Sequence, residues 1–393
     1  MHKYNIYKYI LNFQIHFLLH LNYISGKLIK MLFKRKSDLM SSFAEMTEIK
    51  KENKDKLYEL DYMRFIACLA VMAVHISATG VTEYIHGSFP HIVMLIINRS
   101  LKFTTPVFIF LSGVTSFYSY RKKEFKYFSF LKRRLTKVLV AYFVWCIIYY
   151  AAYIYIGYYG IDIKFFIKSV LLGTMSYHLY FVIIIIQMYI VGPVFYHAMK
   201  NSEKKIHILF VAAIITVLCA EFLRFELSDR VFLKYMVFYM LGIYVTLEYD
   251  KYIDWINKNK IFVVAGYLMS GLIYTVAFFY NMVIITYVWF VFSVFSVVFV
   301  YYVGLVLKYK LKNIYSFIKL FGQSSYYIYL MHPLVLTIMI LYAGNNGIFS
   351  VTKRLLLYSV TVVPVTIISC LVFTAIKNKI KKQKKVALAI NLN

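Results

Sequence analysis

The sequence predicts an all-α polytopic membrane protein with about ten transmembrane helices and both termini in the cytoplasm. Of its 393 residues, 61% are apolar and only 16% are charged. Soluble domains carry about 45–50% apolar and about 25% charged residues. The apolar residues also gather in runs of about 20, the length that crosses a hydrocarbon core of about 30 Å. Lipid is therefore the expected solvent of this chain.

The expected spans are the apolar runs that lie between charged residues. They are 65–82, 103–120, 138–161, 169–199, 206–220, 235–247, two helices within 261–307, 320–352 and 355–376. The run 261–307 is too long for one crossing, so a turn at Asn281 is expected to divide it. The runs 206–220 and 235–247 are shorter than a typical spanning helix.

The positive charge of the chain follows this division into spans. A formal net charge of +28 would suggest a nucleic-acid partner for a soluble protein. Here Lys and Arg gather in alternate loops, most densely in 121–137, which is the pattern of cytoplasmic loops. We therefore expect the lipid bilayer and no nucleic acid as a partner. Lys outnumbers Arg, and Ile, Asn, Tyr and Phe are abundant, which indicates an AT-rich bacterial genome, so a bacterial cytoplasmic membrane is the expected location.

Three parts are expected along the chain. Residues 1–56 are expected to be a poorly ordered cytoplasmic arm or an upstream artefact, with translation starting at Met31, Met40 or Met46. Residues 57–377 form the membrane domain, and 378–393 form a basic cytoplasmic tail. The four cysteines stand singly in apolar runs, with no CxxC pair, so neither a metal site nor a disulfide framework is expected.

The first span carries three ionisable residues on one helix face. Arg64 and His75 are eleven residues apart, which is about three turns and ~16 Å along a helix, and Asp61 lies one turn before Arg64. Ionisable groups inside a membrane are costly and usually face a protein interior or a wet cavity. This face predicts a polar pathway from the cytoplasmic surface toward mid-membrane. Arg64 as an interfacial anchor and His75 as a hydrogen-bonded core residue remain the alternatives.

The stretch 60–75 resembles the opening of the acyltransferase-3 family, whose first helix carries an Arg, ten residues and a His. Five later stretches resemble further motifs of that family in the same order, over roughly 57–377. They are 103–113 with Pro106 and Ser112-Gly113, the basic stretch 130–138, His178-Leu-Tyr180-Phe, Tyr239-Met-Leu-Gly242, and 325–333 from Ser325 to His332-Pro333. The chain departs from the family in having Lys137 where Arg is frequent and Tyr180 where Trp is common.

The resemblance implies a membrane-bound O-acyltransferase that moves an acyl group, with acetyl the first candidate, onto a hydroxyl of a cell-surface or exported polysaccharide. The implied donor is a cytoplasmic acyl-CoA such as acetyl-CoA, a co-substrate, with no bound cofactor, and the implied acceptor is a polysaccharide or a lipid-linked glycan. His75 and Arg64 would be catalytic. His75 could act as general base or carry the acyl group itself, and Arg64 could hold the phosphates or the thioester end of the donor.

The other candidate residues have supporting or binding roles. Asp61 would orient Arg64, and Ser112, Ser325 and His332 would support the site. The donor-binding candidates are Arg133, Arg134 and Lys137, whose charges suit phosphates, and the acceptor-binding candidates are His178 and Tyr180. Close helix packing is the alternative role of Ser112 and Gly113, and capping of a kinked helix is the alternative role of His332.

Two rival functions remain open. One is a translocator of a glycan or lipid-linked sugar without acyl chemistry, which helices interrupted at mid-membrane would favour. The other is acylation of a peptide or a lipid headgroup. The sequence does not distinguish acetyl from succinyl transfer, because both donors need the same phosphate contacts.

Overall fold

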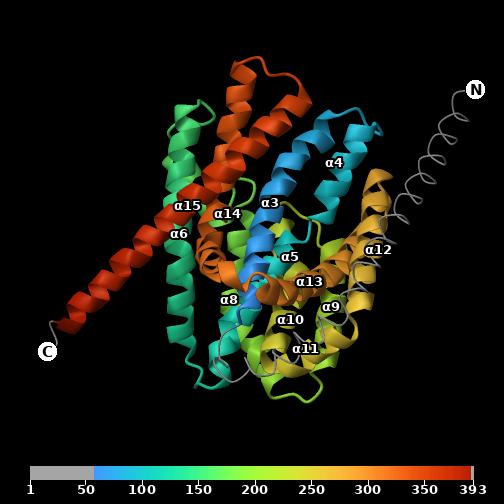
Figure 1. Cartoon of the computed structure of the whole chain (residues 1–393), viewed down its shortest axis with the longest axis vertical. Helices are drawn as coiled ribbons and strands as arrows, with labels where there is room; N and C mark the ends of the chain where they lie inside the picture. The colour runs from blue at the N-terminus through green and yellow to red at the C-terminus, as the bar shows by residue number, and fades with distance from the viewer. Residues whose placement is uncertain (1–56, 391–393) are drawn as a thin grey trace, which may run out of the picture. The chain divides into compact units, whose positions relative to one another are not determined.

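The computed structural model describes residues 57–390, and in this range it is built of helices and short connections (Figure 1). The arm expected at 1–56 lies outside the described residues. The helices are α3 (Glu59–Glu83), α4 (Phe89–Ser100), α5 (Thr104–Phe117), α6 (Tyr127–Tyr155), α7 (Ile163–Leu172), α8 (Tyr180–Lys200), α9 (Lys205–Phe222), α10 (Met236–Leu247), α11 (Tyr249–Lys258), α12 (Lys260–Phe279), α13 (Ile285–Lys310), α14 (Tyr315–Asn345) and α15 (Val351–Ile390), with short 3-10 turns at Tyr118–Arg121, Ser228–Arg230, Phe232–Tyr235 and Lys312–Ile314.

The predicted membrane fold is confirmed. Nine helical segments within residues 57–390 are long and apolar enough to cross a membrane, and the shorter apolar helix Phe232–Leu247 is a tenth candidate. The turn expected at Asn281 is also present. Asn281 has a φ of 48° and lies between the end of α12 and the start of α13. Asparagine tolerates this left-handed backbone conformation better than most residues do.

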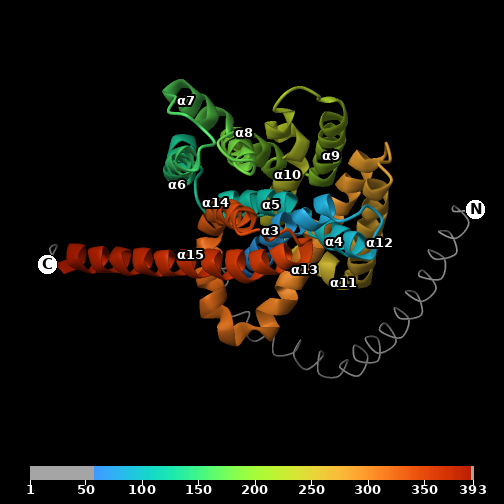
Figure 2. The same ribbon diagram turned by 90° about the horizontal axis from the view of Figure 1, so that it is seen from above.

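Helix α3 lies among the other helices, in contact with α4, α5, α13, α14 and α15 (Figures 1 and 2). Its buried residues are spread around the helix and include Tyr62, Met63, Ala67, Cys68 and Met72, none of which is exposed. A helix that is apolar all round is one that packs on all sides. The polar residues of its face are therefore held among protein neighbours.

Two predicted spans differ from the structure. The second begins before 103, because α4 and α5 form one apolar segment, Phe89–Arg121, that is broken between Ser100 and Thr104. The run 169–199 is not one helix either: α7 ends at Gly173, which has a φ of 67°, and α8 starts at Tyr180. The spans were predicted from the spacing of charged residues. Lys102 therefore resembled a loop residue, and the break at 173–179 left no signal because it contains no Lys, Arg, Asp or Glu.

The two ends of the membrane domain lie at the same end of the bundle. The Tyr315 hydroxyl, at the start of α14, donates a hydrogen bond to Asp61 Oδ2 (2.8 Å) at the start of α3. Lys377 of α15 donates to the hydroxyl of Tyr327, also in the first half of α14. We call this the Asp61 end and the opposite one the Glu83 end. That the Asp61 end faces the cytoplasm stays a prediction from the charge pattern.

The residues expected as a basic tail continue the last helix. Helix α15 is continuous through residue 390, and its last part extends beyond the neighbouring helices (Figures 1 and 2).

Candidate active site

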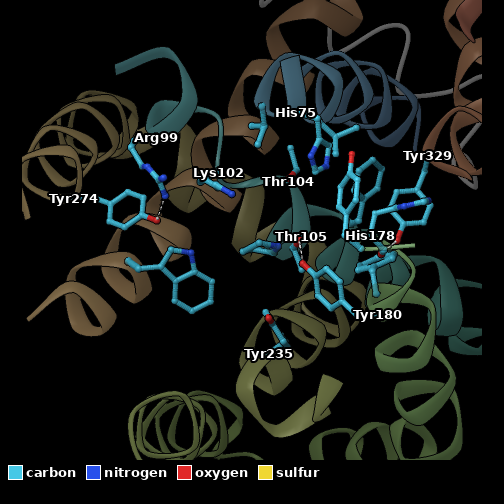
Figure 3. Close-up of a pocket in the computed structure, with 17 residues that line it drawn as sticks. His75, Arg99, Lys102, Thr104, Thr105, His178, Tyr180, Tyr235, Tyr274 and Tyr329 are labelled. Atoms are coloured by element: carbon cyan, nitrogen blue, oxygen red, sulfur yellow. Dashed lines mark hydrogen bonds between the residues drawn. The ribbon is translucent and has the colours of Figure 1, made fainter. Parts of the chain in front are cut away.

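A cavity of ≈ 280 Å³ lies between α3, the α4–α5 break, the connection before α8, and α12, α13 and α14 (Figure 3). Segments far apart in the sequence meet there. Its polar and aromatic lining includes His75, Arg99, Lys102, Thr104, Thr105, Tyr177, His178, Tyr180, Tyr235, Tyr274, Trp289 and Tyr329. The volume is close to the lower end of roughly 300–1,000 Å³ that is typical of small-molecule sites.

His75 lines this cavity and stands beside a second, buried imidazole, that of His332, which is not among the lining residues. The ring centroid of His75 is 5.2 Å from that of His332 and 5.0 Å from that of Tyr177. His332 Nδ1 is 3.0 Å from the carbonyl oxygen of Ile328. Because a carbonyl only accepts, Nδ1 must carry the proton, and Nε2 of the neutral ring is then an acceptor. That buried Nε2 has no hydrogen-bond partner among the described residues.

His178 completes a group of three histidines. Its ring centroid is 5.8 Å from that of His332, and its backbone carbonyl accepts a hydrogen bond from the hydroxyl of Tyr329. His178 lies in the connection between α7 and α8, so the break within the predicted span 169–199 contributes it to the cavity. Next to it, the hydroxyl of Tyr180 lies 3.2 Å from Thr105 Oγ1 (Figure 3). No group of three or more His, Cys, Asp or Glu residues within the described chain is arranged to hold a metal ion.

Arg64 does not line this cavity. Its Nη1 donates to Asp61 Oδ1 at 2.7 Å, in the geometry expected if Asp61 orients it. Between Arg64 and His75 the same helix face carries Cys68, which is 0% exposed, and Val71, which lines the cavity beside His75. The Cys68 thiol is 3.7 Å from the carbonyl oxygen of Ser325. The expected polar pathway between Arg64 and His75 is therefore interrupted by packed side chains.

Arg64 belongs instead to a cluster of cations at the Asp61 end. The Lys137 ammonium interacts electrostatically with Arg134 of its own helix, with Arg64 of α3 and with Lys377 and Lys381 of α15. We call these five residues the basic cluster. Two of its members were not predicted, because Lys377 and Lys381 are far from the donor-binding stretch in the sequence. The five positive charges repel one another, and a ligand with several negative charges would relieve that repulsion. The cluster is therefore suited to a polyanionic ligand.

The remaining predicted residues have local partners. Arg133 Nη2 donates to the Tyr120 hydroxyl at 3.2 Å. Ser112 Oγ lies 3.4 Å from the Tyr189 hydroxyl, and Ser325 Oγ donates to the Gly322 carbonyl at 2.8 Å. The lining of the cavity includes neither serine.

Sequence reasoning missed the two cations of the cavity, Arg99 and Lys102. Both were predicted to be loop residues, because the apolar residues of α4 were not predicted to belong to the same membrane segment as those of α5. Pro106 was the available signal, since proline is tolerated in the first turn of a helix, and α5 begins at Thr104.

A second cavity of ≈ 300 Å³ adjoins the first. The two share Tyr235, Tyr274 and Trp289 as lining residues. The second reaches Asp229, in the connection between α9 and α10, and Thr286, in the first turn of α13, both at the Glu83 end. An elongated ligand could therefore reach His75 from the Glu83 end, whereas the basic cluster lies at the opposite end.

Comparisons with known proteins show the family to which the chain belongs. A family model described as an acyltransferase domain matches residues 57–374. Proteins of Staphylococcus aureus strains MSSA476 and MRSA252, each named "Probable poly-beta-1,6-N-acetyl-D-glucosamine export protein", are 22% identical over 312 and 315 residues, which is 73% of this chain and 84% of theirs. No solved structure matches the chain. With its apolar spans and a match over most of its length, the chain belongs to the acyltransferase-3 family and is a multi-pass bacterial membrane acyltransferase.

Proposed function

We propose that this acyltransferase moves an acyl group, with acetyl the first candidate, from a cytoplasmic acyl-CoA to a hydroxyl of a cell-surface or exported polysaccharide. The observation that carries the proposal is the position of His75. It faces a cavity next to His332, at ~16 Å along α3 from the basic cluster.

The basic cluster supports a CoA donor. Its five cations come from three helices and would bind the phosphates of CoA at the Asp61 end. The extended pantetheine arm would carry the thioester from there toward His75. Cys68, packed against the Ser325 carbonyl, closes that route in the structure, so the donor arm must displace side chains between α3 and α14 when it binds.

The aromatic cavities support a sugar acceptor. Tyr235, Tyr274 and Trp289 line both cavities, and aromatic rings of this kind offer flat apolar faces together with polar groups. The relatives named as exporters of an N-acetylglucosamine polymer point to the same class of acceptor.

The proposed reaction transfers one proton through His75. The neutral imidazole takes the proton of the acceptor hydroxyl as the oxygen attacks the thioester carbonyl, and it returns that proton to the departing thiolate. In the alternative route His75 attacks first, and the acyl-imidazole then passes the acyl group to the hydroxyl. Both routes give an ester and free CoA.

The test is transfer of label from acetyl-CoA to cell-surface polymer in membranes that contain the protein. His75→Ala should lower the rate by about 10²–10⁴-fold, while His207→Ala, a change at an exposed histidine of α9, should leave it unchanged. Wild-type activity in correctly inserted His75→Ala protein would disprove the proposed role.

Export without acyl chemistry is the second candidate. The break between α4 and α5 in the middle of a membrane segment is a feature of transporters, and the relatives are named for export. Cells with and without the gene would distinguish the two functions. Loss of acyl groups from a polymer that is still exported supports the transferase, and unchanged acylation with less exported polymer supports the exporter.

A further inference from the structure

The cavity that contains His75 has two cations and no carboxylate. Arg99 is in the last turn of α4, and Lys102 is in the three-residue break before α5. None of the residues that line the cavity is Asp or Glu. Charged side chains inside a membrane protein are usually paired, because an isolated charge is costly there.

The side chain of Arg99 is held by neutral groups. Its guanidinium carbon lies 3.3 Å from the ring centroid of Phe278, and Nη1 is 3.5 Å from the Tyr274 hydroxyl (Figure 3). Its Nε is buried and has no hydrogen-bond partner among the described residues. These contacts fix the position of the guanidinium without neutralising its charge.

Lys102 is even less compensated. Its side chain makes no hydrogen bond and no ion pair with any residue of the described range, and its charge interacts electrostatically with Arg99 and His75. All three residues line the cavity in Figure 3. The helix that starts beside it has no side-chain cap at its first turn. Uncapped N–H groups and the positive end of the helix dipole add to the positive potential.

Snorkelling does not account for Lys102. The α4 and α5 segments of 12 and 14 residues place it about 18 Å from one end of this broken span and about 21 Å from the other. Both lengths exceed the reach of a lysine side chain, so its charge stays at the cavity.

We propose that the cavity binds an anionic oxygen group, a carboxylate or a phosphate, between Lys102 and Arg99. This inference rests on the proposed function, since the group would belong to one of its two substrates. It would be either the carboxylate at the far end of a dicarboxylic acyl group or an acidic group on the acceptor glycan.

Anion binding can be tested without acyl transfer. Purified protein in detergent is unfolded by heat with sodium succinate or sodium phosphate, and with sodium chloride at equal ionic strength. Succinate or phosphate should raise the Tm of the wild type, because a ligand that binds only the folded state stabilises it. Succinate or phosphate should raise the Tm of Lys102→Met less than that of the wild type, whereas Lys102→Arg, which keeps the charge, should show the full increase.

Two control variants locate the bound anion. Lys168→Met, a change at an exposed lysine of α7, should keep the whole shift. Lys137→Met removes a charge of the basic cluster and should remove a different part of the shift. A shift that Lys102→Met leaves intact and Lys137→Met abolishes would overturn the proposal, because all binding would then be at the basic cluster.

Transfer assays identify the source of the anion. The probes are succinyl-CoA and acetyl-CoA. If Lys102→Met lowers the rate of succinyl transfer by about 10- to 100-fold, and lowers that of acetyl transfer less, the anion belongs to the acyl group. A larger loss with an acidic than with a neutral acceptor places it on the glycan. Equal losses for all substrates would overturn charge recognition. No transfer from either donor in the wild type would disprove the proposed function and leave the Tm result standing.

Discussion

At the scale of single residues, the histidine pair makes a sharper prediction than either histidine alone. His332 donates from Nδ1 to the Ile328 carbonyl, its Nε2 has no hydrogen-bond partner among the described residues, and its ring centroid lies 5.2 Å from that of His75. An acceptor in that position can take the N–H of His75 and so leave the other nitrogen of His75 free to accept a proton. His332 is then a positioning residue for the proposed base.

His332→Ala should therefore lower kcat by about 10–100-fold, as the loss of a group that orients a metal-binding histidine does. The KM for the donor should change little, because its phosphates bind elsewhere. Glutamine places an amide near the position of Nε2, and asparagine places one near Nδ1. Better recovery by His332→Gln than by His332→Asn supports the positioning role, and the reverse order favours a role limited to the kink at Pro333.

A buried carboxylate at the start of α3 gives a prediction about stability. Glu59 is fully buried and accepts hydrogen bonds from Tyr249 (2.9 Å) and Tyr301 (3.2 Å), and it pairs with Lys308 at 3.0 Å. Lys308→Met leaves the carboxylate without its counter-ion, a change that costs roughly 3–5 kcal/mol for buried pairs. The two tyrosines should keep the loss near the lower figure.

Thermal unfolding in detergent measures this loss. The double variant Glu59→Gln with Lys308→Met should be more stable than Lys308→Met alone, because no unpaired charge remains. If the double variant is the less stable of the two, the ion pair does not account for the effect.

At the scale of helices, the approach of α5 to α10 depends on two glycines. A Cβ at Gly113 would collide with the carbonyl oxygen of Tyr239, and a Cβ at Gly242 would collide with that of Phe110. Small residues at helix contacts are typical of membrane proteins. The Ser-Gly motif of the sequence thus has a packing role through its glycine.

Gly113→Ala should destabilise the protein by about 1–3 kcal/mol, because the two backbones must move apart. Gly344→Ala is the matched control, since Gly344 lies in α14 and a Cβ added there would have no heavy atom within 4 Å apart from its chain neighbours and the nearby backbone of its own helix. It should be neutral or raise stability by about 0.4–1 kcal/mol. Equal effects of the two substitutions on the Tm would contradict the packing role.

The connections between helices also show which parts of the fold could be predicted from the sequence. The turn at Asn281 was predictable, because a run of that length cannot cross the bilayer once and asparagine adopts a positive φ. The breaks at 101–103 and 173–179 were not. The first resembles a charged loop, and the second is uncharged. What holds them inside the bundle is contact with other helices, such as Thr105 with Tyr180.

At the scale of the whole membrane domain, the site depends on long-range contacts. The sequence predicted His75, His178 and His332 one by one, and only the packing of α3, the connection before α8, and α14 brings their rings together. The same holds for the basic cluster, in which α15 supplies two of five cations. Helical periodicity orders residues within one helix, and it carries no information on which helices become neighbours.

The orientation of the domain gives the last prediction. Positive loops stay in the cytoplasm, so the Asp61 end with the loop after α5 should face inward and the Glu83 end outward. A cysteine introduced at Lys123 in one variant and at Asn346 in another, both exposed positions, would report this orientation. A membrane-impermeant maleimide should label Asn346→Cys in intact cells and Lys123→Cys only after permeabilisation. The native cysteines at 68, 146 and 370 are buried, and the partly buried Cys219 is replaced by Ala to lower the background. The opposite labelling pattern would reverse the orientation, and the basic cluster would then face away from the cytoplasmic pool of acyl-CoA on which the proposed reaction depends.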